Sequence, residues 1–269
     1  MPATMYFFSE FQQSYLWLPF IGFAIGLLAS MIGSGGGFFF PLILILFFGI
    51  PTQMAVATSL AASLPLCVSG TIMHYRKKNI HLKIGLVFAV AGIIGAVGGA
   101  WITRLLTSDE LKTAFGIYSV FLAGIIIMNS LRKKNNSNSE NEYKIELSPG
   151  KVAKGSVFGL VGGIISGTFG TSGSMPVLGG LMALRTPLRL VVGTSLMVVL
   201  VNTLSGLGGH FLLGEIDMTL VLLLTAGSIA GAALGPQLLT KVNLSKVEKP
   251  AKLAVAAIVI VSGIVMIIN

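Results

Sequence analysis

The sequence predicts an all-α membrane protein, a polytopic helical bundle of two inverted repeats with about 8–10 transmembrane segments. Three observations support this fold class. Of the 269 residues, 54% are hydrophobic and only 10% are charged, and the mean hydropathy is +0.90. The apolar residues occur in long uninterrupted runs, and a set of polar positions recurs at a fixed spacing between the two halves. Because soluble domains carry about 25% charged residues, this composition cannot cover a water-facing surface.

The apolar runs predict helices. No charged residue lies between Ser14 and Arg76, and a helix needs about 20 residues to span a bilayer, so this run alone can hold up to three crossings. An isolated chain in lipid must satisfy its own backbone groups, and the alternation typical of a membrane barrel is absent. The expected helices cover residues 15–33, 36–49, 53–75, 82–104, 110–131, 152–170, 173–184, 188–213, 217–240 and 250–269.

A polar linker divides the chain in the middle. Residues 132–150 (RKKNNSNSENEYKIELSPG) are rich in charged, Asn and Ser residues and end in Pro-Gly, as is typical of a solvated connection. We therefore expect a first membrane repeat over residues 1–131, a cytoplasmic linker over 132–150, and a second membrane repeat over 151–269.

The two halves match at a shift of 136 residues. Residues 51–74 align without gaps to residues 187–210, with nine of the 24 positions identical. The matches include Pro, a Thr-Ser-Leu triplet, a Ser-Gly pair and a final His, and agreement at polar positions argues against chance similarity between apolar segments. The sequence thus predicts a duplicated fold.

Loop charges indicate that the repeats are inverted. The loop at 75–83 is basic while its partner at 211–219 carries only acidic residues, and the loop at 49–53 is uncharged while its partner is basic. An inverted arrangement with the N-terminus outside places 16 of the 18 Lys and Arg residues inside, whereas parallel four-span halves place only 10 there. The positive-inside rule therefore favours inversion. We expect both termini on the outer face, and we do not expect the net charge of +9 to bind nucleic acid.

Two glycine-rich breaks interrupt apolar segments at matching places. Helix packing by small residues is the plainer interpretation, but paired interruptions favour a transport site, and a broken helix exposes N–H groups that suit an anion. The candidate binding residues of the first break are Gly33, Ser34, Gly35, Gly36 and Gly37, and those of the second break are Gly170, Thr171, Ser172, Gly173 and Ser174.

Other polar residues recur on the neighbouring helices. The pairs Thr58-Ser59 and Thr194-Ser195 have hydroxyls that could face an anion, and Asn202 lies about two turns beyond the second pair. Such hydroxyls also bond to the carbonyl of their own helix. His74 and His210 occupy equivalent positions and are candidates for gating or proton coupling, with a purely structural role as the alternative.

No enzyme, metal or cofactor signature appears in the sequence. Each of the nine acidic residues lies near a predicted helix end or in a loop, so no mid-membrane carboxylate is available for ion coupling. Export of an anion from a negatively charged interior gains about 2.3 kcal/mol per charge per 100 mV. We therefore expect electrogenic facilitated export, or coupling through His.

Both halves resemble a known family. The segments SMIGSGGGFFFPLILILFFGIPTQMAVATSL and FGTSGSMPVLGGLMALRTPLRLVVGTSL resemble the sulfite exporter TauE/SafE family of membrane permeases over nearly the whole chain. The resemblance implies transport of small sulfur-containing anions, such as sulfite or organosulfonates, outward across the bacterial inner membrane. Ser174-Met175 replaces the Gly-Phe of the first half, which warns against assuming identical contacts from both halves.

The sequence therefore predicts a secondary transporter whose partners are a small anion and the bilayer. An anion channel and a non-transporting membrane scaffold remain as alternatives. A homodimer is compatible with the sequence.

Overall fold

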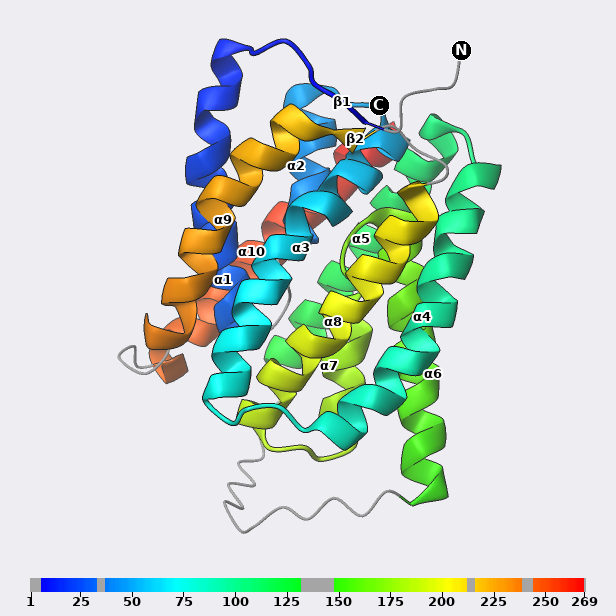
Figure 1. Ribbon diagram of the computed structural model, residues 1–269, viewed down its shortest axis with the longest axis vertical. Coiled ribbons are helices and arrows are strands. Elements are labelled where there is room, and N and C mark those ends of the chain that lie inside the picture. Colours follow the sequence, from blue (N-terminus) through cyan, green and yellow to red (C-terminus); the bar gives the residue numbers. More distant parts are fainter. Residues whose placement is uncertain (1–5, 33–36, 132–147, 212–215, 239–243, 269) are drawn as a thin grey trace.

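Within the described residues, ten α-helices in two sets of five form the bundle (Figure 1). The computed structural model describes residues 6–32, 37–131, 148–211, 216–238 and 244–268, so Gly33, Ser34, Gly35, Gly36 and nearly all of the linker lie outside the described residues. The first set comprises α1 (Leu18–Ile32, preceded by the 3-10 helix Gln13–Trp17), α2 (Phe39–Phe48), α3 (Thr52–Arg76), α4 (Leu82–Leu105) and α5 (Ser108–Leu131). The second comprises α6 (Pro149–Phe169), α7 (Ser174–Ala183), α8 (Leu188–Phe211), α9 (Met218–Leu238) and α10 (Leu244–Ile268). Every predicted segment is confirmed as a helix, and the largest difference is the earlier start of α10.

Helix length separates crossings from hairpins. Within the described residues, seven helices are long and apolar enough to cross a membrane. The helices α2 and α7 have 10 residues each and are about 15 Å long, half of a hydrocarbon core of about 30 Å. In the second half, α7 packs against α6, so the long helix before the break and the short helix after it form a hairpin. In the first half, α2 packs against α3.

Equivalent helices point in opposite directions. In Figure 1, α3 descends while α8 ascends, and α4 ascends while α9 descends. The C-terminus and the start of α1 lie at the upper end, and α6 begins at the lower end. Inverted repeats produce this arrangement because each half contributes an odd number of passes.

The first helix of each half packs against the fourth helix of the other half. A Cβ atom on Gly163 of α6 would overlap the carbonyl oxygen of Gly92 on α4, and a Cβ on Gly26 of α1 would overlap the carbonyl oxygen of Ser228 on α9. These contacts occupy equivalent positions in the two repeats, and they belong to the most extensive helix pairings, α4 with α6 and α1 with α9. Small residues let membrane helices approach backbone to backbone.

The helices consequently form two groups that mix the halves of the chain. The α4 group contains α4, α6, α7 and α8, while the α1 group contains α1, α2, α3 and α9. The groups meet where α3 crosses α8, with a Cβ on Gly70 lying 3.4 Å from Leu196 and a Cβ on Gly206 lying 3.4 Å from Leu60. These two contacts are exact equivalents at the 136-residue shift, and α5 packs against α10 beside them.

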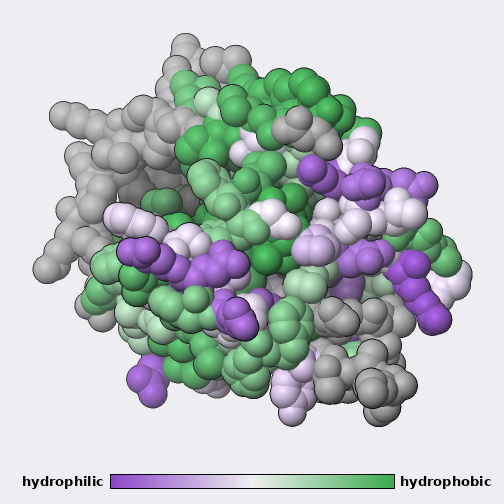
Figure 2. All heavy atoms as spheres, turned by 90° about the horizontal axis from the view of Figure 1, so that it is seen from above, coloured by the Kyte–Doolittle hydropathy of each residue, from purple (hydrophilic) through white to green (hydrophobic). Residues whose placement is uncertain are grey.

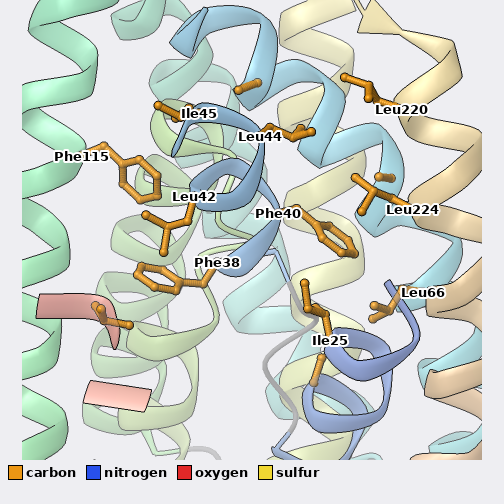
Figure 3. Packing of buried hydrophobic residues seen from close by; sticks show 14 of the residues in the cluster. Ile25, Phe38, Phe40, Leu42, Leu44, Ile45, Leu66, Phe115, Leu220 and Leu224 are labelled. Carbon is orange, nitrogen blue, oxygen red and sulfur yellow. The ribbon is translucent and has the colours of Figure 1, made fainter. Parts of the chain in front are cut away.

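The short helix α2 lies inside the bundle. Figure 3 shows Phe38 and Leu42 on the side facing Phe115 of α5, and Phe40 turned toward Ile25 of α1 and Leu224 of α9. Phe40 is fully buried, which explains why this segment reads as apolar throughout.

The upper end is polar. Figure 2 shows hydrophilic residues gathered in a band across this end with hydrophobic residues around it. A short parallel pairing of β1 (Tyr6–Phe7) with β2 (Ile216–Asp217) lies here, and the sequence did not predict it. It joins the start of the chain to the turn before α9.

The glycine packing between α4 and α6 makes a testable prediction. Gly163→Ala should destabilise the protein by about 1–3 kcal/mol, because overpacking forces backbones apart, and Gly26→Ala should do the same in the equivalent interface. Gly98→Ala is the matched control, since nothing lies within 4 Å of its Cβ position and alanine favours a helix. Thermal unfolding of the purified variants measures the difference. Equal melting temperatures for the Gly163 and Gly98 variants would contradict the close packing.

Candidate functional site

The second break has an unusual backbone. The helix α6 ends at Phe169, and Gly170, Ser172 and Gly173 adopt left-handed conformations with φ of 67°, 63° and 59° before α7 begins. Such a φ is disfavoured for a residue with a Cβ, so Ser172 is held there by its surroundings. Residues in such conformations gather at functional sites.

The two breaks touch each other. A Cβ atom added to Gly37 would overlap the hydroxyl oxygen of Ser172, so the last glycine of the first break lies directly against the serine of the second. Gly170 packs against the α3 backbone, with its Cβ position 2.7 Å from the carbonyl oxygen of Val56. The structure thus places Gly37, the one described residue of the first break, against the second break.

Buried polar atoms without partners occur at the second break and on the neighbouring helices α3 and α8. The hydroxyls of Ser59, Ser63 and Ser172 and both polar atoms of the Asn202 amide have no hydrogen-bond partner among the described residues, and all four side chains are fully buried. An unpaired buried polar group costs about 1–3 kcal/mol. Several such groups near one point are expected where a polar ligand binds.

Helix geometry places these groups around the breaks. Ser59 and Ser63 follow Val56 by three and seven residues on α3, so they share the helix face that meets Gly170. The amide nitrogen of Asn202 lies 3.6 Å from the Cβ position of Gly162, which itself lies 2.9 Å from the carbonyl oxygen of Gly173. Asn202 therefore sits beside the N-terminus of α7, where free N–H groups favour anions.

Aromatic rings line one side of the breaks. Phe169 stacks on Phe115 at a centroid distance of 5.4 Å and on Tyr118 at 5.2 Å, and Phe38 contacts Phe115 edge-on at 5.9 Å. Sequence reasoning missed this aromatic cluster, although Phe38 and Phe169 directly flank the two breaks. Phe115 and Tyr118 on α5 are not next to a break in the sequence, so nothing there pointed to them.

In the two predicted Thr-Ser pairs, the threonines and the serines make different contacts. The Thr58 hydroxyl accepts the N–H of Asp217 at 3.2 Å, and the Thr194 hydroxyl accepts the N–H of His81 at 2.9 Å. These bonds are equivalent, and each ties the third helix of one half to the start of the fourth helix of the other. The threonines therefore have a structural task that the sequence did not reveal. The Ser195 hydroxyl donates to the Val192 carbonyl at 2.9 Å.

The two histidines hold the ends of the interrupted helices. Nε2 of His210 lies 2.6 Å from the carbonyl oxygen of Gly167, and Nε2 of His74 lies 3.5 Å from that of Ser30. Ser30 and Gly167 each precede the first glycine of a break by three residues. Both rings are buried, and they lie toward opposite ends of the molecule because α3 and α8 are antiparallel.

Two further predicted residues are placed by the structure. Ser174 is buried in the first turn of α7, and Thr171 is buried next to Ser172. In the described part of the chain, no three His, Cys, Asp or Glu side chains come together as a metal site.

Basic side chains gather at the lower end of the bundle. They occupy the end of α3, the starts of α4, α6 and α8, and the turn after α7, all of which lie at that end in Figure 1. The residues are Arg76, Lys77, Lys78, Lys83, Lys151, Lys154, Arg185 and Arg189. The field of this end attracts anions.

Comparison with known proteins agrees with this architecture. The family model described as "Sulfite exporter TauE/SafE" matches residues 13–266. The chain is 32% identical to the probable membrane transporter protein YdhB of Bacillus subtilis over 216 residues, covering 79% of this chain and 85% of that protein. It is 26% identical to a probable membrane transporter protein of Methanocaldococcus jannaschii over 266 residues, covering 93% and 94%. The helical membrane fold, the paired breaks and the family match together place this chain in the TauE/SafE sulfite exporter family of membrane transporters.

Proposed function

We propose that this transporter exports small sulfur-containing anions, such as sulfite or organosulfonates, across the bacterial inner membrane. The observation that carries the proposal is the contact between Gly37 and Ser172, together with the buried hydroxyls on α3 and the Asn202 amide on α8, which have no partner among the described residues. The substrate class follows from the family, whose model is described as a sulfite exporter. Neutral donors and the N-terminus of α7 suit an oxyanion.

The distribution of charge supports outward movement. The basic lower end is the end that we propose faces the cytoplasm, by the positive-inside rule, with both termini on the outer face. Anions collect at such a surface before they enter. A negative interior then favours export by about 2.3 kcal/mol per charge per 100 mV.

Alternating access is the mechanism that the helix grouping favours. The α1 group supplies Gly37, Ser59 and Ser63, whereas the α4 group supplies Ser172 and Asn202. The proposed site would thus lie between two bodies of similar structure and opposite orientation. Rocking of one body against the other would expose the site to each side in turn.

The site can be tested by transport. Proteoliposomes containing the wild type should take up sulfite with saturation and counterflow. Ser172→Gly should reduce this uptake at least about tenfold, since losing a hydrogen bond to a charged group costs about 1.5–3 kcal/mol. The same change should preserve or raise the melting temperature, because glycine adopts the left-handed backbone without a steric penalty.

A matched serine provides the control for this experiment. Ser119 on α5 is equally buried, and its hydroxyl donates to the Phe115 carbonyl at 2.8 Å. Ser119→Ala should leave uptake close to the wild-type rate. Normal uptake by the Ser172 variant would remove the break from the transport site.

Cross-linking across α3 and α8 distinguishes the carrier from a channel. In a Cys67→Ala background, a short bis(methanethiosulfonate) reagent, which forms a disulfide with each cysteine and releases methanesulfinate, should join Leu60→Cys to Gly206→Cys and hold the groups together toward the upper end. The same reagent joining Gly70→Cys to Leu196→Cys should hold them toward the lower end. Each cross-link should abolish sulfite flux, and a cleavable reagent should allow recovery on reduction. Persistent flux in both cross-linked proteins would indicate a channel that needs no relative motion.

A further inference from the structure

We infer that the turn between α3 and α4 binds the headgroup of an anionic phospholipid, such as phosphatidylglycerol, in the leaflet at the lower end of the molecule. This site is separate from the two breaks, and it does not depend on which anion the protein transports. The inference follows from a hollow in the surface, from the residues that line it, and from the apolar helix faces beside it.

A hollow of about 400 Å³ opens at this turn, which lies at the lower end of the bundle (Figure 1). Tyr75, Arg76, Lys78 and Ile80 line it. Arg76 and Lys78 are exposed, and neither forms an ion pair with any residue that the structure describes. The hollow therefore places two positive charges beside an aromatic ring and an aliphatic side chain, a combination that suits a phosphate attached to an apolar body.

Contacts with α8 hold the turn in place. The His81 N–H donates to the Thr194 hydroxyl at 2.9 Å. A Cβ atom on Gly193 would overlap the carbonyl oxygen of Asn79, so the turn lies directly on the backbone of α8. The backbone of the turn is therefore fixed before a ligand binds, which lowers the entropy lost on binding.

Lys78 occupies a backbone conformation that lysine does not favour. Its φ is 56°, in the left-handed region that glycine enters without a steric penalty. At the 136-residue shift, the equivalent of Lys78 is Gly214 and the equivalent of Arg76 is Leu212. The repeat itself therefore does not require cations here, and a residue kept in a disfavoured conformation points to a role in binding.

The hollow lies at the depth of lipid headgroups. The helix α3 has 25 residues and is about 37 Å long, which exceeds a hydrocarbon core of about 30 Å. Arg76 is the last residue of this helix, so it lies in the headgroup region of one leaflet. Tyr75 is 61% exposed, and tyrosine is enriched at the interface between membrane and water.

Apolar side chains continue from the hollow toward the middle of the bilayer. On α3, the exposed residues Val68 and Ile72 precede Tyr75 by seven and three residues, so all three share one helix face. On α4, directly after the turn, Leu82 and Leu86 are exposed one helical turn apart. Acyl chains can therefore pack on these faces while the phosphate pairs with the cations, whereas a water-soluble phosphate ester has only the charged part of the site to bind.

Phosphatidylglycerol and phosphatidylcholine with the same acyl chains form a matched pair of probes, because choline neutralises the phosphate. In a neutral detergent, phosphatidylglycerol should raise the melting temperature of the purified protein with saturation, and native mass spectrometry should detect it on the protein. Phosphatidylcholine should bind at least about tenfold more weakly, which corresponds to about 1.4 kcal/mol. The soluble headgroup glycerophosphoglycerol should give no shift at the same concentration.

Variants of the turn locate the site. Arg76→Gln combined with Lys78→Gly should weaken phosphatidylglycerol binding at least about tenfold, since each cation near the surface contributes to the attraction. Lys78→Gly should by itself preserve or raise the melting temperature without lipid, because glycine relieves the left-handed backbone. The loss of binding is then distinguishable from unfolding.

A second double variant is the matched control. Arg185 at the same end has a φ of 57°, and its equivalent in the first half is Gly49. Arg185→Gly combined with Arg189→Gln removes the same charge from this end, but neither residue lines the hollow. This control should bind phosphatidylglycerol with an affinity close to that of the wild type.

Three results would overturn the site. Equal binding of the two lipids, or an equal loss of affinity in both double variants, would indicate attraction to the basic end as a whole. An equal shift with glycerophosphoglycerol would indicate a site for soluble phosphate esters. The linker carries Glu140, Glu142 and Glu146, and phosphatidylglycerol binding that appears only after their change to Gln would indicate that the linker occupies the hollow.

Discussion

The central constraint on this molecule is that two helices are interrupted inside a membrane, where no water is available to satisfy the exposed backbone groups. Irregular backbone at this depth must be covered by protein or must line a polar site. The structure uses both solutions. The aromatic cluster of Phe38, Phe115, Tyr118 and Phe169 covers one side of the breaks, and buried hydroxyls with the Asn202 amide surround them elsewhere. The histidines bond to carbonyls in the last turn before each interruption.

Covering the breaks requires the halves to exchange helices. Because α1 packs on α9 and α6 packs on α4, neither half can bury its interrupted helix alone. The backbone contacts at Gly26 and Gly163 make these interfaces dense, whereas the α3–α8 crossing consists of ordinary side-chain contacts near Leu60 and Leu196. The α3–α8 pairing is nevertheless as extensive as the α3–α9 pairing within the α1 group.

The repeats are equivalent in backbone but not in side chains. Asn202 corresponds to Leu66, and His81, which caps the start of α4, corresponds to Asp217, which caps the start of α9. The threonine bonds that hold these two caps are nevertheless conserved between the halves of the chain. The scaffold therefore keeps the symmetry of the repeat, while the side chains near the breaks depart from it.

The sequence by itself determined the helices, the two breaks, the repeat and its inversion. Hydrophobic runs, glycine clusters and loop charges are local properties, so the ten segments and the orientation of α3 against α8 could be predicted before any contact was known. The aromatic pair on α5, the structural task of Thr58 and Thr194 and the lack of partners around Asn202 required the tertiary structure. The packing of α1 and α6 against helices of the opposite half could also be seen only in the tertiary structure. Many helices here carry small residues at helical spacing. The sequence alone does not distinguish which of these small-residue faces pack against one another. Only packing in three dimensions decides which stripes meet and which polar side chains are left without a partner.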